Sequence, residues 1–165
     1  MTPRSTPTRT LILLRHAKSA WPADTPDARR PLAARGRRDA PAVGRWLRTH
    51  IPAIDQVVHS PAVRAVQTWD LAGAQLATAP PASSDERLYG ASAACLLAVT
   101  RELAPEASTA LLVGHNPGLE DFLTLLTGAT EPLKTSSLAV IALPGSWTDT
   151  TPDAGRLEKL ATPRG

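Results

Sequence analysis

Apolar residues along the chain gather in short runs, and these runs alternate with segments in which apolar residues recur every three to four positions. A short apolar run bounded by turn residues is typical of a buried strand, and the wider spacing is typical of a helix packed on one face. We predict strands over residues 10–16, 56–60, 109–115 and 136–144. We predict helices at about 33–50, 60–76, 92–104 and 116–128. This alternation favours an α/β fold with a mostly parallel sheet flanked by helices.

Two of the predicted helices carry clear start signals. Each opens with a capping side chain followed by proline at the first helical position. The pairs are Ser60 with Pro61 and Asn116 with Pro117. Gly128 follows the last apolar residue of the second helix and is expected to end it.

Three further segments complete the predicted organisation. Pro41, inside the helix at 33–50, should kink that helix or mark a late start. The segment 77–86 is rich in proline and serine and is expected to be a loop. The segment RLEKLATP, residues 156–163, alternates weakly between apolar and polar and is expected to add an antiparallel edge strand.

The length of 165 residues fits one domain with a core of ordinary size. The N-terminal stretch MTPRSTPTRT is polar and contains proline, so we expect a flexible tail over residues 1–8 and a single domain over 9–165. No apolar run approaches the ~20 residues that a membrane helix needs, so no membrane partner is expected. Because the N-terminus lacks a signal-peptide pattern, we expect a cytoplasmic location.

The net charge of +3 and the sequence pI of about 9.6 raise the question of a nucleic-acid partner. The basic residues are scattered along the chain, however, and only RRPLAARGRR at 29–38 is dense. This stretch contains no interleaved aromatic residue, so we expect a solvated helix face and no nucleic-acid partner.

The single cysteine and the four tryptophans carry weaker information. Cys95 can form no internal disulfide, and its apolar helical surroundings predict a small core residue. Trp46 and Trp69 lie on predicted helices and are expected in or near the core, whereas Trp21 and Trp147 fall in loops and are candidates to flank a site or a contact.

Polar side chains mark the ends of three predicted strands. They are Arg15 and His16, His59 and Ser60, and His115 and Asn116. In open α/β sheets, ligands bind beyond the carboxyl ends of the strands, so these side chains are expected to converge on one site. The site would be strongly basic.

A phosphoryl group is the ligand that such a cluster suits best. Arginine offers a planar fork of donors that matches phosphate oxygens, and helix N-termini add oriented N–H groups. Arg64 lies on the first turn of the helix after Pro61, where it can reach the same ligand. A metal site is the alternative, since three histidines lie near strand ends, but Arg15 and Arg64 would repel a cation and no acidic residue or cysteine accompanies them. We expect no metal and no other cofactor.

The same residues carry a family resemblance. LLRHAKS, HSPAVRAVQT and LLVGHNPG, in that order, resemble three signature segments of the histidine phosphatase superfamily, which includes the phosphoglycerate mutases. RHAKSAWP, RRPLAARGRRDAP, ERLYGA, GHNPGLEDF and the short overall length further resemble the SixA-type phosphohistidine phosphatases, compact members without an added helical cap. The resemblance covers about residues 9–145. It implies a phosphoglycerate mutase-like three-layer sandwich and a single histidine phosphatase domain over 9–165.

The resemblance also implies roles for individual residues. His16 would be the nucleophile, forming a transient phosphohistidine that water later hydrolyses. Arg15, Arg64 and His115 would form the phosphate pocket and stabilise charge during transfer. Further candidates for substrate contact are Lys18, Ser19 and Asn116. For Lys18 and Ser19 the alternative is an exposed loop position, and for Asn116 it is a helix cap.

The general acid departs from the family pattern. The mutases use a glutamate and the phytase-like branch an aspartate next to the second histidine, but Asn116 occupies that position here. Asp85 and Glu86 are the nearest candidates for a mutase-like acid, with surface charges as the alternative. Because imidazole departs more readily than an alkoxide, a missing acid fits cleavage of an N–P bond better than cleavage of a phosphate ester.

We therefore hypothesise a metal-independent phosphatase that removes phosphate from phosphohistidine in a protein. One alternative keeps the same site and acts on small phosphomonoesters. Another is a non-catalytic module that binds a phosphorylated partner.

Overall fold

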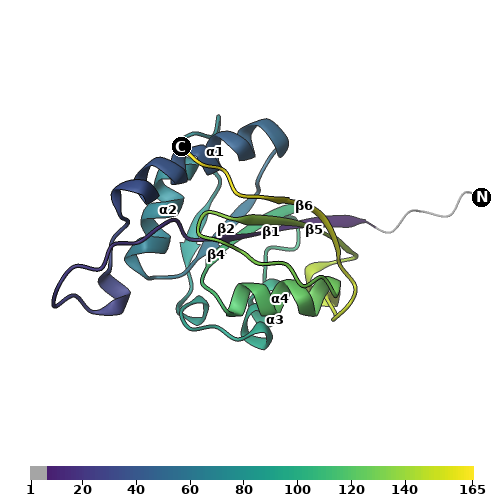
Figure 1. Cartoon of the computed structure of the whole chain (residues 1–165). Helices are drawn as coiled ribbons and strands as arrows, with labels where there is room; N and C mark the ends of the chain where they lie inside the picture. The colour runs from purple at the N-terminus through teal and green to yellow at the C-terminus, as the bar shows by residue number, and fades with distance from the viewer. Residues whose placement is uncertain (1–6) are drawn as a thin grey trace, which may run out of the picture.

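Residues 7–165 are described by the computed structural model, in which six strands form one sheet between two pairs of helices (Figure 1). The strands are β1 (Thr8–Arg15), β2 (Gln56–His59), β3 (Ala82–Ser84), β4 (Thr109–Gly114), β5 (Leu138–Pro144) and β6 (Arg156–Ala161). Their order in the sheet is β3-β2-β4-β1-β5-β6. The four strands from β3 to β1 are parallel, whereas β5 is antiparallel to β1 and β6 to β5. The predicted α/β fold with an antiparallel edge strand is confirmed.

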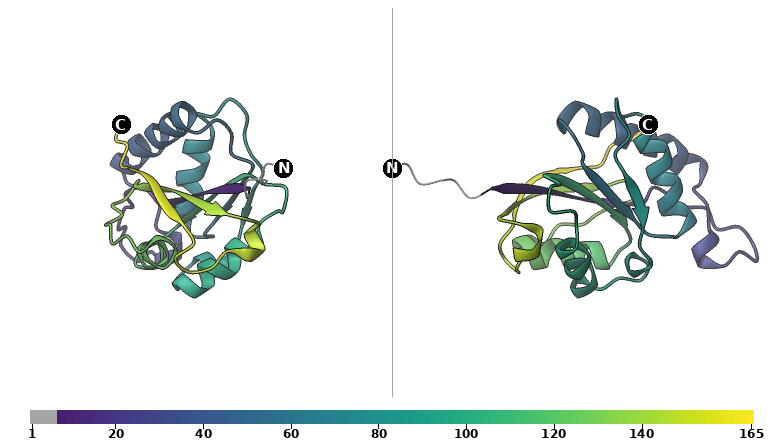
Figure 2. Two further views of the ribbon diagram at one scale, coloured as in Figure 1. Left: turned by 90° about the vertical axis from the view of Figure 1, so that its right-hand side faces the viewer. Right: turned by 180° about the vertical axis from the view of Figure 1, so that it is seen from behind.

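The helices cover both faces of this sheet (Figures 1 and 2). They are α1 (Ala34–His50), α2 (Val63–Gly73), α3 (Ala93–Arg101) and α4 (Gly118–Thr127). Three single-turn 3₁₀ segments are η1 (Asp27–Arg29), η2 (Glu86–Leu88) and η3 (Trp147–Asp149). Within residues 7–165, every helix is too short or too polar to span a bilayer.

The sequence of the central strand β1 is apolar without interruption because both faces of the strand are buried. Ile12 and Leu14 pack into the core cluster shared with α1 and α2, while Leu11 and Leu13 pack into the cluster shared with α3 and α4. Successive side chains of a strand point to opposite faces, so a sheet covered on both faces buries all four.

The register brings the polar strand ends together. Arg15 of β1 pairs with Gly114 of β4, and His59 of β2 pairs with Val113 of the same strand. His16, Ser60 and His115 therefore follow their strands at one carboxyl edge of the sheet.

The two helix starts marked by a capping residue and proline were predicted one or two residues too early. The second helix, α2, begins at Val63 rather than at Pro61, because the Ser60 hydroxyl accepts from the Ala62 N–H and also contacts the His115 ring. The fourth, α4, begins at Gly118 with Pro117 in the cap position.

Other boundaries differ less. The predicted stop at Gly128 is confirmed, since Gly128 ends α4 in the left-handed conformation at φ 74°. Pro41 lies inside a continuous α1. The predicted loop at 77–86 contains the short strand β3, which pairs with β2, and the prediction of a core Cys95 is wrong because this thiol is exposed.

The predicted tail over residues 1–8 lies largely outside the described residues, which begin at residue 7. Thr8 already belongs to β1, and the Pro7 carbonyl accepts from the Gly145 N–H at 2.7 Å.

Candidate active site

A pocket of about 250 Å³ opens at the carboxyl edge of the sheet. Its lining residues are Arg15, His16, Lys18, Ser19, Trp21, Arg30, Arg64, His115, Asn116 and Thr135. All seven candidate site residues named from the sequence are among them. Trp21, a candidate to flank a site or a contact, is also in the lining, whereas Arg30 and Thr135 were not predicted there, and His59 does not line the pocket. The pocket is strongly basic, and no carboxyl group belongs to its lining.

A larger pocket, of about 400 Å³, lies at the amino ends of β2 and β3. Its lining comes from residues 51–55 and 76–81 with Arg48, and Arg48 and Asp55 are its only charged members. It contains no convergent set of reactive side chains, so we place the candidate active site in the smaller, basic pocket.

His16 lies on the floor of the pocket, with 7% of its surface exposed. Its Nδ1 contacts the Ala17 carbonyl at 2.7 Å, and because a carbonyl only accepts, Nδ1 must carry the proton. Nε2 is then left with its lone pair. The pKa of His16 is lowered to about 3, mainly by burial, and the neighbouring cationic groups act in the same direction. The ring is therefore neutral at ordinary pH.

Thr68 of α2 joins the nucleophile candidate to the helix that carries Arg64. The Thr68 hydroxyl accepts from the Ala17 N–H at 2.9 Å and donates to the Arg64 carbonyl at 2.6 Å. Thr68 is fully buried. This one side chain fixes the turn after β1 against the first part of α2.

His115, which follows β4, approaches His16 with 5.0 Å between ring centroids. Its Nε2 contacts the Ser60 hydroxyl at 2.8 Å, and Nδ1 is buried without a partner among the described residues. Burial, together with the charge of Arg64, lowers the pKa of His115 to about 4. This second histidine is thus also neutral at ordinary pH.

Arg15 and Asn116 share one anchor, the backbone carbonyl of Leu133. Nη1 of Arg15 donates to it at 2.9 Å and Nδ2 of Asn116 at 2.8 Å. The expected alternative role of Asn116 as a helix cap is therefore not what the structure shows. Burial lowers the pKa of Arg15, whose Nε has no partner within the described part of the chain.

Arg30 organises the loop that follows the nucleophile candidate. Its guanidinium donates to the Ser19 hydroxyl and, through Nε, to the Ala20 carbonyl at 3.0 Å. Trp21 lies over the same guanidinium, 3.2 Å from ring centroid to Cζ, and is itself 74% exposed. Lys18 also lines the pocket and is exposed. The prediction that Trp21 flanks the site is consistent with this position, whereas Trp147 is buried in the core.

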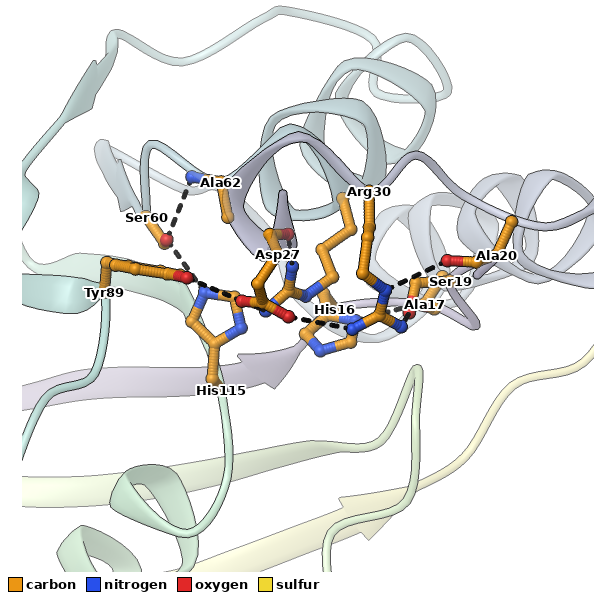
Figure 3. Close-up of polar contacts among 11 residues, drawn as sticks. His16, Ala17, Ser19, Ala20, Asp27, Arg30, Ser60, Ala62, Tyr89 and His115 are labelled. Atoms are coloured by element: carbon orange, nitrogen blue, oxygen red, sulfur yellow. Dashed lines mark hydrogen bonds and ion pairs between the residues drawn. The ribbon is translucent and has the colours of Figure 1, made fainter. Parts of the chain in front are cut away.

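An acidic residue outside the lining connects two of its arginines. Asp27 of η1 accepts from Nη2 of Arg64 at 3.0 Å and from Nη1 of Arg30 at 3.0 Å. Tyr89, whose ring edge faces His115, donates its hydroxyl to Oδ2 of Asp27 at 2.6 Å. Figure 3 shows Asp27 between Tyr89 and Arg30.

The two acids considered from the sequence do not line the pocket. Asp85 instead binds Arg87, which in turn pairs with Glu102, and Glu86 belongs to the exposed η2 turn. Within residues 7–165, no group of three or more histidine, cysteine, aspartate or glutamate side chains is placed to hold a metal ion.

Sequence reasoning missed Asp27, Arg30, Thr68 and Tyr89 as parts of this site. Arg30 and Asp27 lie in a segment without strand or helix periodicity, and Tyr89 follows a loop, so only the folded chain brings them together. Three of these residues do lie in motifs that carry the resemblance: Arg30 in RRPLAARGRRDAP, Thr68 in HSPAVRAVQT and Tyr89 in ERLYGA.

Comparison with known proteins gives a consistent result. The family model described as histidine phosphatase superfamily (branch 1) matches residues 11–126. An uncharacterized protein of Mycobacterium tuberculosis (strain ATCC 25618 / H37Rv) is 37% identical over 162 residues, which cover 92% of this chain and 100% of that protein.

Two solved structures are similar over nearly the whole chain. A Nakamurella multipartitia protein, provisionally assigned as the phosphohistidine phosphatase SixA, has a TM-score of 0.87 and 31% identity, with coverage of 97% of this chain and 99% of that one. The protein histidine phosphatase SixA complexed with tungstate has a TM-score of 0.81 and 25% identity, with coverage of 93% and 97%. The chain therefore belongs to branch 1 of the histidine phosphatase superfamily and is a phosphatase.

Proposed function

We propose that this phosphatase removes phosphate from phosphohistidine in a protein, through a covalent phosphohistidine on His16. The observation that carries this proposal is a neutral histidine on the floor of a basic pocket that has no carboxyl group in its lining. Such a pocket suits transfer of a phosphoryl group whose leaving group needs no general acid.

His16 is the nucleophile. Because Nδ1–H is held by the Ala17 carbonyl, Nε2 is the nitrogen free to attack phosphorus. As the new P–N bond forms, the P–N bond of the substrate breaks and its electron pair passes to the departing ring, which carries a proton on its other nitrogen and so leaves as neutral imidazole. In the second step water attacks phosphorus, and His16 departs with the electron pair of its own P–N bond. A pKa of about 3 keeps the ring unprotonated for the first step.

Arg15, Arg64 and His115 hold the phosphoryl oxygens. Arg15 Nε and His115 Nδ1 have no partners among the described residues, so each is free to serve an oxygen of the ligand. Charge stabilisation of this kind is the main term in phosphoryl transfer, and loss of one donor should lower the rate about 100-fold or more. Lys18, Ser19 and Asn116 complete the substrate contacts.

The leaving group favours an N–P bond. An alkoxide needs a proton as it departs, and neither Asp85 nor Glu86 lines the pocket to supply one. An imidazole ring that already carries a proton on its other nitrogen departs without such help. Phosphohistidine is therefore the substrate class that this set of residues suits better than a phosphate ester.

The surroundings of the pocket suit a protein substrate. The segments 16–33 and 129–137, which border it, contain no α-helix, and Lys18 and Trp21 are exposed at its side. The similarity to two SixA structures supports the same substrate class, and the tungstate complex of one of them supports an oxyanion site.

The test is a trapped phosphoenzyme. Wild-type protein and a His16→Ala variant are mixed with a ³²P-phosphohistidine protein, quenched within milliseconds and separated. Wild type should carry label that is stable to base and labile to acid, and His16→Ala should carry none. If wild type carried no label and released no phosphate under these conditions, the chain would be a non-catalytic binding module and the proposal would be overturned.

Two further measurements define the substrate and the metal requirement. Turnover of the phosphohistidine protein should exceed that of sugar or glycerate phosphates by at least about 100-fold, because only the esters need the missing acid. Fast turnover confined to esters would show a small-molecule phosphatase instead. Addition of EDTA should leave the rate unchanged, whereas loss of activity would point to a metal site.

A further inference from the structure

Asp27 is the one carboxylate bonded to the pocket arginines within the described residues. Its side chain is 50% exposed, whereas the Arg64 and Arg30 side chains that it binds are only 8% exposed. The carboxylate therefore lies on the solvent side of both guanidinium groups, at the mouth of the pocket. Asp27 binds two residues of the lining but does not itself line the pocket.

The carboxylate has capacity for one more donor. Oδ2 accepts from Arg64 and from the Tyr89 hydroxyl, whereas Oδ1 accepts only from Arg30. An ionised carboxylate offers about four acceptor positions, so one position on Oδ1 is open. The hydrogen bond from Tyr89, followed by those from the two arginines, holds the pKa of Asp27 well below its usual range, so the group is ionised at ordinary pH.

In-line transfer directs the leaving group toward this carboxylate. The attacking and leaving atoms lie on opposite sides of phosphorus, and His16 is on the buried floor. The leaving group must then lie toward the solvent side, at the level of Asp27. For a phosphohistidine substrate, the group directly beyond phosphorus in this direction is the imidazole ring with its second nitrogen.

We infer that Asp27 is a specificity-determining residue, whose carboxylate accepts a hydrogen bond from the N–H of the substrate imidazole at the nitrogen not bonded to phosphorus. The inference rests on the proposed function and names the chemistry of its leaving group. The bound ring is held as an imidazolium. When the P–N bond breaks, its electron pair returns to the ring, which leaves as neutral imidazole while the proton on the far nitrogen stays in place.

This role explains how a site without a general acid can still be selective. An imidazolium is a far better leaving group than a neutral imidazole, and a nearby carboxylate stabilises the cation. The same carboxylate gives no help to an alkoxide, because it has no proton to donate, and it repels the negative charge that develops there. One ionised group thus favours N–P substrates and disfavours esters.

The test compares two small substrates in wild type and Asp27→Asn. Phosphoimidazole has the proposed leaving group, and p-nitrophenyl phosphate has one that departs without a proton. In Asp27→Asn, kcat/KM for phosphoimidazole should fall about 10-fold or more, as for loss of a charged hydrogen bond. For p-nitrophenyl phosphate it should stay within about threefold or rise. Asp24→Asn is the matched control, since Asp24 is an exposed acid of the same loop, and it should change neither value.

Other results would overturn the inference. An equal fall on both substrates would make Asp27 only an anchor for Arg64, and weaker tungstate binding to Asp27→Asn would show the same directly. A rise on both substrates would make the carboxylate an obstruction of the pocket. In either case wild-type turnover of phosphoimidazole would leave the proposed function standing, whereas wild type that cleaves only p-nitrophenyl phosphate would contradict the function itself.

Discussion

Two histidines at strand ends, His16 buried and His115 partly buried, make the stability of this protein depend on pH. The pKa is lowered to about 3 for His16 and about 4 for His115, compared with 6.5 as the ordinary value. Between these values the unfolded chain binds protons that the folded chain does not, so stability is highest above pH 6.5 and falls as pH drops toward 4. The neutral rings required for catalysis and the acid sensitivity of the fold therefore have one cause, which is burial.

We predict that the melting temperature falls between about pH 7 and about pH 5, a range above the titration of most carboxylates. In His16→Gln this fall in melting temperature should be smaller, because one of the two histidines with a lowered pKa has been removed. His50→Gln is the control, since His50 is an exposed residue at the end of α1, and it should keep the wild-type dependence. Equal dependence in wild type and His16→Gln would contradict the prediction.

Thr68 is predicted to affect both stability and catalysis. Thr68→Val removes the acceptor of the Ala17 N–H and leaves that buried group unsatisfied, which costs about 1–3 kcal/mol in the free energy of unfolding. Because the turn that carries His16 is then no longer tied to the Arg64 carbonyl, kcat should fall about 10-fold or more.

Thr100→Val is the matched control for this change. Thr100 is also fully buried, and its hydroxyl donates only to the Leu96 carbonyl within α3. In Thr100→Val, denaturant unfolding should show a smaller loss of stability than in Thr68→Val, and steady-state kinetics should show the wild-type kcat. If both variants had the same kcat, the proposed link through Thr68 would be refuted.

At the scale of the elements, α1 has two close contacts that serve different purposes. A Cβ at Gly36 would collide with the backbone carbonyl of Lys18, in the loop beside the pocket. A Cβ at Gly44 would collide with the backbone carbonyl of Ala72, where α1 crosses α2. The first turn of α1 therefore packs against the loop that borders the pocket, and the middle of α1 packs against α2.

Alanine at these two glycines should separate the two purposes. Each substitution adds a methyl group to a tight contact at a cost of about 1–3 kcal/mol, partly offset by the better helix propensity of alanine, ~1 kcal/mol. Gly44→Ala should lower the melting temperature and leave kcat/KM nearly unchanged. Gly36→Ala should also lower kcat/KM about 10-fold, since the loop with Lys18 and Ser19 must move. Loss of activity in Gly44→Ala alone would be inconsistent with this division.

The strands that the sequence predicted well are those with a long, uninterrupted run of apolar residues. β1 and β4 are buried on both faces, so their sequences are uninterrupted apolar runs. β3 was missed because its three residues are exposed and give no apolar signal. The start of α2 was misplaced because the Ser60 hydroxyl serves His115, a contact that local capping rules do not include.

At the scale of the whole molecule, the sequence could predict which residues meet but not all that surrounds them. Arg15, His16 and His115 follow parallel strands, whose carboxyl ends share one edge, so their convergence follows from topology. Asp27 and Tyr89 are separated by 62 positions and come from two irregular segments, so only tertiary packing decides that they meet beside the pocket.

Because the pocket draws residues from β1, from α2 and from the loops that follow β1, β4 and α4, an oxyanion bound there should stabilise the entire fold. Tungstate at a concentration 100 times its Kd should add about 2.7 kcal/mol to the free energy of unfolding. For a chain of this size, that raises the melting temperature by roughly 5–10 °C. Arg64→Gln should abolish most of this rise, because a buried guanidinium at the ligand is lost. Arg45→Gln removes the same charge from the exposed side of α1 and should keep the full rise, since net charge alone does not create the site. An equal loss in both variants would mean that tungstate binds through the overall positive charge of the protein and not in the pocket.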